Sequence, residues 1–365
     1  MIILIFFVIY CASGMVSGAR LFEQTFGMDY SNALLVGAVS TILYVFIGGF
    51  IAVSWTDTVQ ASLMLFALIL TPIFIFTEAG GFNAAVLLVD ERNPELFSFM
   101  KGISWVAIIS FAGWGLGYVG QPHILVRFMA AKSVRGMGGA RRISISWMIL
   151  CLAGAVIIGM FGNAFSVLHP EIDISNPEKI FVIITQTLFT PWIAGILLSA
   201  ILAAIMSTLS CQLLVASTTL TADFYRRLIR PHASQSELVW CGRGMLLLVA
   251  VIAFAIASDP TSGILSLVSY AWAGFGASFG PAVVLSLFWK NMNLKGCIAG
   301  MVTGAVVVIV QENLMIMDLY SLVPGFILSV LAIVTVSKLT ASKEDPCQEL
   351  FHKLEQQFWQ EVKER

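Results

Sequence analysis

The sequence has few charged residues, because only 11% of its 365 residues are Asp, Glu, Lys or Arg. A soluble globular domain carries about 25% charge, so an ordinary cytosolic enzyme is excluded. Twenty Lys and Arg against 21 Asp and Glu leave a net charge of −1, without the basic excess that indicates a nucleic-acid partner. The hydrophobic fraction of 58% excludes a disordered chain. These values predict a membrane protein with several spans.

The sequence also lacks motifs for metal binding and catalysis. Its six cysteines contain no CxxC pair, and its four histidines are widely dispersed. This pattern predicts free thiols and no metal centre. A GxGxxG match at residues 115–120 has no strand before it and no acidic residue at the distance that a dinucleotide site requires. We therefore expect neither an enzyme nor an organic cofactor.

Long uncharged apolar runs are the main feature that is present. A bilayer core of about 30 Å needs roughly 20 apolar residues per helix. Because backbone groups in lipid must be hydrogen-bonded internally, these runs predict an all-α polytopic membrane protein with about ten spans. The runs lie at residues 2–18, 32–54, 59–77, 103–120, 144–166, 190–222, 239–257, 263–289, 297–311 and 319–337.

The few charges alternate between the loops. Basic residues follow the fourth, sixth and eighth runs, whereas the alternate loops are acidic. Positive charge favours the cytoplasmic side, so this pattern predicts that both termini lie in the cytoplasm. Of the 20 Lys and Arg residues, 16 then lie on that side. The four on the acidic side are Arg20, Arg92, Lys101 and Lys179.

The chain divides into a transmembrane domain over residues 1–338 and a cytoplasmic tail over residues 339–365. In the tail, apolar residues recur every four positions at Leu350, Leu354, Phe358 and Val362. This spacing predicts an amphipathic helix that packs on the protein or lies on the membrane surface.

The fourth run is predicted to be a broken helix. It contains four glycines between Gly113 and Gly120 and ends at Pro122. A broken helix in lipid is tolerated where its freed backbone faces protein or a cavity, which is how transporters build binding sites. Trp114 and Tyr118 are four residues apart and form one aromatic face. The alternative is close glycine packing with interfacial aromatic residues.

The sixth run carries a stripe of small and hydroxyl-bearing residues, namely Ala204, Ser207, Thr208 and Cys211. Almost no ionisable residue lies within the spans, which argues against a proton pump. Hydroxyl and main-chain oxygens suit Na⁺, a hard cation, and a neutral solute. The alternative is that the hydroxyls hydrogen-bond to their own helix.

Asp57 lies between the second and third runs. We interpret residues 54–58 as a short turn in which the Asp57 carboxylate caps the next helix, and we favour this over a role in an ion path.

Five strings together closely resemble the sodium:solute symporter family. They are residues 9–14, 46–50, 55–60, 113–122 and 201–211. The resemblance implies a core of two inverted five-helix repeats and sodium-coupled uptake of L-proline, by alternating access, across the bacterial inner membrane. It also implies that the first span corresponds to the third core helix, so that the first repeat is truncated. A transport-inactive fragment of such a symporter is therefore the alternative function.

The resemblance assigns roles to single residues. The residues that match the proline-binding positions are Tyr10, Trp114, Tyr118 and Pro122. Those that match the sodium-binding positions are Ala204, Ser207 and Thr208. Those that match positions near the sodium path are Asp57, Gly195 and Cys211.

Overall fold

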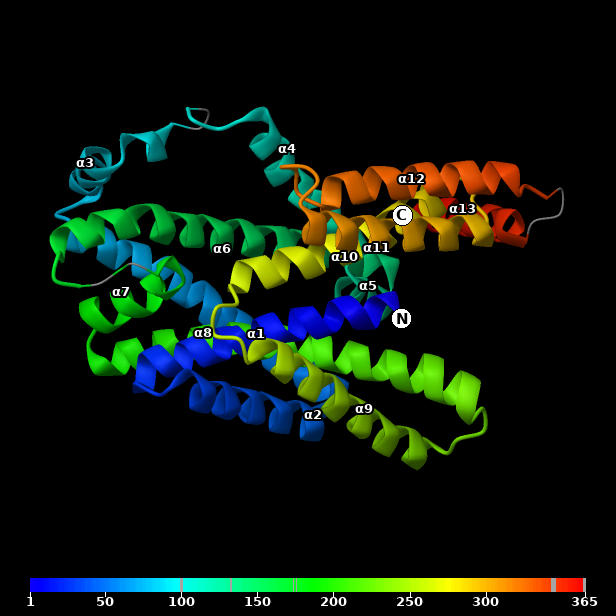
Figure 1. The fold of residues 1–365 in the computed structure, drawn as a ribbon, viewed down its shortest axis with the longest axis horizontal. Coiled ribbons are helices and arrows are strands. Elements are labelled where there is room, and N and C mark those ends of the chain that lie inside the picture. The colour runs from blue at the N-terminus through cyan, green and yellow to red at the C-terminus, as the bar shows by residue number, and fades with distance from the viewer. Residues whose placement is uncertain (99–100, 132, 173, 175, 343–345, 364–365) are drawn as a thin grey trace. The chain divides into compact units, whose positions relative to one another are not determined.

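The computed structural model describes residues 1–98, 101–131, 133–172, 174, 176–342 and 346–363, and these residues contain helices and no strand (Figure 1). The α-helices are α1 (Ile2–Phe26), α2 (Tyr30–Glu78), α3 (Phe82–Arg92), α4 (Trp105–Gly113), α5 (Pro122–Met129), α6 (Val134–Leu168), α7 (Ile180–Leu188), α8 (Pro191–Thr219), α9 (Gln235–Ala257), α10 (Ile264–Phe288), α11 (Leu294–Leu314), α12 (Leu322–Leu339) and α13 (Pro346–Lys363). The 3₁₀-helices are η1 (Pro94–Phe97), η2 (Trp114–Gly120) and η3 (Pro177–Lys179), and η4 (Leu220–Ile229) is π-helical.

Nine helical segments among the described residues are long and apolar enough to cross a membrane. This confirms the prediction of an all-α polytopic membrane protein. The predicted fourth run differs from the others, because it forms only the shorter apolar segment Trp105–Gly120. There α4 ends at Gly113 and the chain continues as the 3₁₀-helix η2. The glycines in this segment and the proline after it explain the early end of the α-helix.

The predicted turn at residues 54–58 is helical, so the interpretation of Asp57 as a helix cap is wrong. The N-cap of α2 is Asp29, and Asp57 lies inside the helix. Thr56 and Thr58 donate their hydroxyl protons to the carbonyls three and four residues before them, at 3.0 and 3.5 Å. These hydrogen bonds satisfy the hydroxyl groups within the helix, so residues that are typical of turns can also lie inside a helix.

The two spans within α2 are nevertheless inclined to each other. The Tyr44 hydroxyl hydrogen-bonds to the Thr56 hydroxyl. On a straight helix, residues 12 positions apart would be separated by about 18 Å along the axis. The segments Tyr30–Ile47 and Val53–Glu78 therefore count as two spans, as the sequence predicts.

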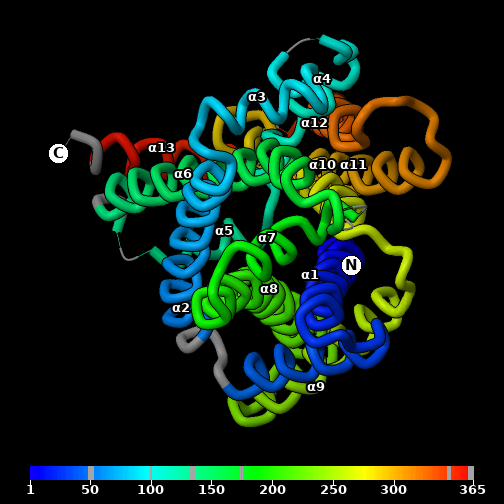
Figure 2. Tube along the Cα trace, turned by 90° about the vertical axis from the view of Figure 1, so that its left-hand side faces the viewer, coloured from blue at the N-terminus to red at the C-terminus, as the bar shows by residue number. Residues whose placement is uncertain are grey.

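The chain forms two compact units. Unit 1 contains residues 1–10, 103–130 and 265–365, and unit 2 contains residues 11–102 and 131–264. In unit 2, α2 packs along both α6 and α8 (Figure 2). Gly154 of α6 lies against the Leu68 carbonyl of α2, so the two backbones approach closely. This unit also holds apolar clusters around Phe161 and Leu197.

In unit 1, α11 and α12 pack along their lengths (Figure 1). Gly296 and Gly300 of α11 face Ser337 and Ile333 of α12, leaving no room for a larger side chain. Gly304 faces the Ala277 carbonyl of α10 in the same way. The small-residue stripe of α11 therefore serves helix packing.

The tail forms the helix α13, whose Leu350 and Leu354 side chains are 58% and 56% exposed. Together with Trp289 and Met292 they line a cavity of about 310 Å³ at the turn between α10 and α11. The tail helix therefore lies on unit 1. The side chain of Val362 is outside the described residues.

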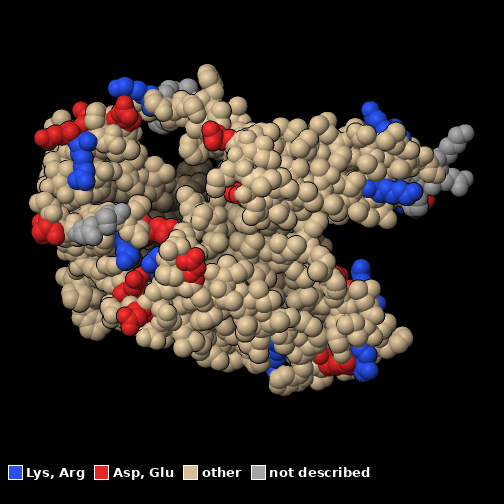
Figure 3. Space-filling model, in the orientation of Figure 1, with Lys and Arg blue, Asp and Glu red and all other residues tan. Residues whose placement is uncertain are grey.

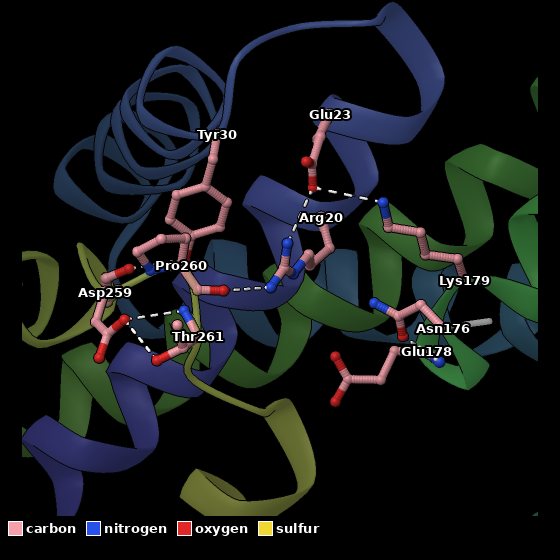
Figure 4. A network of polar contacts seen from close by, with 10 residues as sticks. Arg20, Glu23, Tyr30, Asn176, Glu178, Lys179, Asp259, Pro260 and Thr261 are labelled. Carbon is pink, nitrogen blue, oxygen red and sulfur yellow. Dashed lines mark hydrogen bonds and ion pairs between the residues drawn. The ribbon is translucent and has the colours of Figure 1, made fainter.

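Charged side chains gather at helix ends, and the surface shown in Figure 3 is largely uncharged along the helices. In unit 2, Arg20 and Lys179 both pair with Glu23, at 3.2 and 3.8 Å (Figure 4). Arg20 also donates to the Pro260 carbonyl at 2.5 Å. Lys101 pairs with Glu95 at 3.8 Å, so three of the four basic residues on the acidic side are paired with a carboxylate. The network around Glu23 holds the end of α1 to η3 and to the loop after α9.

We predict that Gly120→Ala lowers the thermal stability of the purified protein, by about 1–3 kcal/mol. A Cβ atom at Gly120 would lie 2.6 Å from the Phe275 carbonyl oxygen and 2.8 Å from the Gly280 nitrogen, where only backbone is present to move. Gly115→Ala is the matched control, because a Cβ atom there meets nothing within 4 Å. Tryptophan fluorescence during thermal unfolding in detergent measures both variants. Equal melting temperatures would contradict this account of the close approach.

Candidate functional site

The residues that the sequence singles out fall into two groups, one in each unit. The predicted proline-binding residues Tyr10, Trp114, Tyr118 and Pro122 all belong to unit 1. The predicted sodium-site and sodium-path residues all belong to unit 2, and they are Asp57, Gly195, Ala204, Ser207, Thr208 and Cys211.

An aromatic cluster surrounds the broken helix in unit 1. Trp114 stacks on Trp272 of α10 and on Tyr320, with ring centroids 5.9 and 5.5 Å apart and planes 15° apart in both pairs. Tyr118 meets Trp272 edge to face at 4.9 Å. The sequence predicts the aromatic face of Trp114 and Tyr118, and the structure shows that a second helix completes it. Tyr118 remains 43% exposed, so the cluster has an open face.

Hydrogen bonds from side chains satisfy the backbone that the broken helix frees. The Trp272 indole N–H donates to the Trp114 carbonyl at 3.1 Å. The Gln121 amide donates to the carbonyls of Gly117 and Trp272, at 3.0 and 3.4 Å. Gly117 has no space for a side chain, because Trp272 occupies it. The glycines therefore allow both the 3₁₀ conformation and the close approach of α10.

Tyr10 and Pro122 lie beside the same segment. Tyr10 is 9% exposed, and its ring meets that of His123 edge to face at 5.8 Å. Pro122 is in the first turn of α5, where backbone N–H groups have no partner within the helix. The N–H that proline lacks therefore costs α5 no hydrogen bond. Burial, together with the Arg127 guanidinium, lowers the pKa of His123 to about 4. The His123 ring is therefore neutral at neutral pH.

In unit 2, the hydroxyl stripe of α8 faces a carboxylate of α2. The Ser207 hydroxyl donates to Oδ1 of Asp57 at 2.8 Å. Asp57 is 9% exposed and lies within the span Val53–Glu78. A carboxylate is rarely buried within a span unless it has a functional or structural partner. The structure thus brings together a predicted sodium-site residue and a predicted sodium-path residue.

Ser207 differs from the other hydroxyl residues of its helix. Most of these donate to carbonyls of their own helix, as do Ser199, Ser210, Ser217, Thr218 and Thr219. Thr208, by contrast, is an exposed residue, and its hydroxyl makes no hydrogen bond to the described residues. Ala204 and Cys211 are half-buried on the same stripe. The alternative of hydroxyls bonded to their own helix therefore does not describe Ser207 or Thr208.

Gly195 is not part of this group. It precedes Ser207 by 12 positions on α8, which corresponds to about 18 Å along the axis. Gly195 is exposed, and its carbonyl accepts a hydrogen bond from Ser199 at 2.7 Å. A Cβ atom there would meet nothing within 4 Å.

Three residues of interest are not predicted from the sequence. Trp272 and Tyr320 are essential parts of the aromatic cluster but lie far from Trp114 in sequence. Gln212 is fully buried, and neither of its amide atoms has a hydrogen-bond partner within the described structure. Gln212 is polar but not ionisable, so a search of the apolar runs for ionisable residues does not detect it.

Comparisons with known proteins agree with these features. The profile of the sodium:solute symporter family matches residues 1–304. The sodium/proline symporter of Escherichia coli (strain K12) is 56% identical over 354 residues, which cover 96% of this chain and 70% of the relative. The osmoregulated proline transporter OpuE of Bacillus subtilis (strain 168) is 47% identical over 359 residues, which cover 97% of this chain and 73% of the relative.

A solved structure shows the same fold. It is a Na⁺-coupled sialic acid symporter in a substrate-bound, outward-open state, with a TM-score of 0.77 and 18% sequence identity. The match covers 94% of this chain and 74% of the symporter.

We predict that Ser207→Ala destabilises the protein by about 1.5–3 kcal/mol, because it removes a hydrogen bond to a buried carboxylate. Ser199→Ala is the matched control on the same helix, since Ser199 is exposed and bonds to its own helix. Its effect is expected to stay within about 0.5 kcal/mol. Thermal unfolding in detergent measures both. A Ser207 variant as stable as the Ser199 variant would show that the Asp57 contact contributes nothing.

Proposed function

This chain belongs to the sodium:solute symporter family, and on that premise we propose that it couples the uptake of L-proline to the inward flow of Na⁺. The family transports solutes and is not a family of enzymes. One observation carries the choice of proline. Relatives that are 47–56% identical over nearly the whole chain are named as sodium/proline symporters or proline transporters.

The driving force is sufficient for a useful pump with one ion. A Na⁺ ion that crosses about 100 mV releases roughly 2.3 kcal/mol. A tenfold Na⁺ gradient adds about 1.4 kcal/mol. The sum of roughly 3.7 kcal/mol supports accumulation of a neutral solute by several hundred-fold. Alternating access delivers this coupling when the loaded carrier changes its orientation and the half-loaded carrier does not.

We assign the proline site to Tyr10, Trp114, Tyr118 and Pro122. Proline is a zwitterion with an apolar ring, so its site needs an apolar wall and a few polar atoms. The stacked Trp114 and the half-exposed Tyr118 supply such a wall. The oxygen of the Gln121 side chain is buried without a hydrogen-bond partner in the described structure, and it adds an acceptor beside that wall.

We assign the sodium site to Ala204, Ser207 and Thr208. Hard cations take oxygen ligands, which here are the main-chain carbonyl of Ala204 and the two hydroxyls. The Asp57 carboxylate bonds to Ser207 and supplies negative charge in a medium of low dielectric constant, where it attracts a cation strongly. We also assign Cys211 and Gly195, which lie on the same helix, to the sodium path.

We place the protein in the cytoplasmic membrane with both termini in the cytoplasm. This orientation counts the shorter apolar segment Trp105–Gly120 as a tenth crossing beside the nine longer segments. The segment after α8 contributes Arg226, Arg227 and Arg230, which mark its end as cytoplasmic. At the other end of α9, Asp259 accepts hydrogen bonds from the Thr261 backbone and hydroxyl, which lower the pKa of that carboxyl. The tail over residues 339–365 then lies in the cytoplasm.

Uptake of radiolabelled proline tests the proposal. Cells that lack their own proline uptake and produce this chain are expected to accumulate proline in Na⁺ medium and not in choline medium. A sodium ionophore should abolish the accumulation, because it dissipates the gradient. Unlabelled proline should compete with the label, whereas glutamate should not. Cells that carry the chain in the membrane and take up no proline would contradict the proposal, as would uptake that is independent of Na⁺.

We further predict that Thr208→Ala raises the Na⁺ concentration for half-maximal uptake by roughly tenfold or more. The reason is that the substitution removes one of the oxygen atoms that we assign as ligands of the Na⁺ ion. Thr219→Ala is the matched control, since the Thr219 hydroxyl donates to the Val215 carbonyl of its own helix at 2.9 Å. Uptake measured over a series of Na⁺ concentrations compares the two. An unchanged Na⁺ dependence in the Thr208 variant would remove Thr208 from the sodium site.

A further inference from the structure

A cavity of about 380 Å³ opens in unit 2, away from the Asp57–Ser207 pair. Its volume is in the range of binding sites for small organic molecules. Three elements line it, namely α2, α9 and the continuous segment formed by α8 and η4. Most of the lining is apolar and includes Val45, Phe46, Leu214, Leu238, Val239 and Leu246.

Two arginines, Arg226 and Arg243, face this apolar cavity. Neither has a carboxylate within ion-pair distance among the described residues. The neighbouring basic residues do have such partners, because Arg227 pairs with Asp223 at 4.0 Å and Arg230 with Glu237 at 3.3 Å. The cavity therefore carries a positive charge that the protein itself does not neutralise.

Arg243 lies well inside its helix. It follows the first residue of α9 by eight positions, about 12 Å along the axis. Its guanidinium lies over the rings of Phe46 and Trp240, with distances of 5.0 and 4.8 Å to the ring centroids. Trp240 is 62% exposed, as aromatic residues at a membrane interface often are. An arginine beside such an aromatic residue is typical of the depth at which lipid headgroups lie.

We propose that this cavity binds an anionic phospholipid. The phosphate lies between Arg226 and Arg243, because the planar guanidinium group matches phosphate oxygens with paired donors. An acyl chain lies along Phe46, Leu214 and Leu246. Two positive charges favour an anionic lipid over a zwitterionic one, whose cationic headgroup they repel. The apolar lining favours a lipid over free inorganic phosphate.

Native mass spectrometry of the full chain in detergent tests the site. The protein is mixed with phosphatidylglycerol and phosphatidylcholine that carry the same acyl chains. The unaltered protein is expected to retain one phosphatidylglycerol in preference to phosphatidylcholine. The double variant Arg226→Gln/Arg243→Gln should bind phosphatidylglycerol roughly 10- to 30-fold more weakly. Arg227→Gln is the matched control and should keep the preference, since Arg227 does not line the cavity.

A second variant separates lost binding from lost folding. Gly242 lines the cavity, and a Cβ atom there meets only the Thr221 hydroxyl oxygen, at 3.5 Å. Gly242→Leu should therefore fill the cavity and reduce phosphatidylglycerol binding while both arginines remain. Undiminished binding in Gly242→Leu, or in a folded double arginine variant, overturns the proposal. Equal retention of the two lipids by the unaltered protein overturns it also, as does displacement of the lipid by excess inorganic phosphate.

Discussion

The freed backbone of the broken segment Trp114–Gly120 is the constraint on which unit 1 depends. In an apolar medium each carbonyl that a helix no longer satisfies needs another donor. The Trp272 indole and the Gln121 amide supply these donors, at 3.1 and 3.0 Å. The Trp272 indole reaches its carbonyl only because Gly117 lets α10 approach, whereas Gln121 reaches the Gly117 carbonyl from four residues further along the same segment. The same contacts order Trp114 and Trp272 into a stacked pair, so the need for backbone hydrogen bonds also builds the aromatic wall.

In unit 2 the polar group that needs a partner inside a span is the carboxylate of Asp57. Asp57 is buried within a span, where an unpaired carboxylate is costly. Its hydrogen bond with Ser207 joins α2 to α8, the pair of helices that also packs along its length. A cation close to a buried carboxylate stabilises it. The position of Asp57 beside the predicted sodium ligands is therefore chemically consistent with sodium coupling.

Much of this fold is predictable from the sequence, because a span needs only a long apolar run. The exceptions are informative. Residues 54–58 read as a turn because serine, threonine and aspartate favour caps and turns, yet their hydroxyls bond within the helix. The glycines and proline of the fourth run predict a broken helix, which the structure confirms, but they do not predict that Trp272 of α10 packs on it. Gly195 and Ser207 lie on the same helix but 12 positions apart. The family resemblance, which assigns both residues to sodium transport, does not show that they are distant from each other.

The sequence by itself determined the class of protein, the helical type of its spans, the broken helix and the hydroxyl stripe on α8. These properties follow from composition and from spacing along one helix, which are local. Only the tertiary structure decided that Trp272 and Tyr320 complete the aromatic cluster, that Asp57 bonds to Ser207, and that Arg226 and Arg243 share a cavity. Each of these pairs is separated by at least 17 residues, and helix packing, rather than local pattern, sets which residues meet.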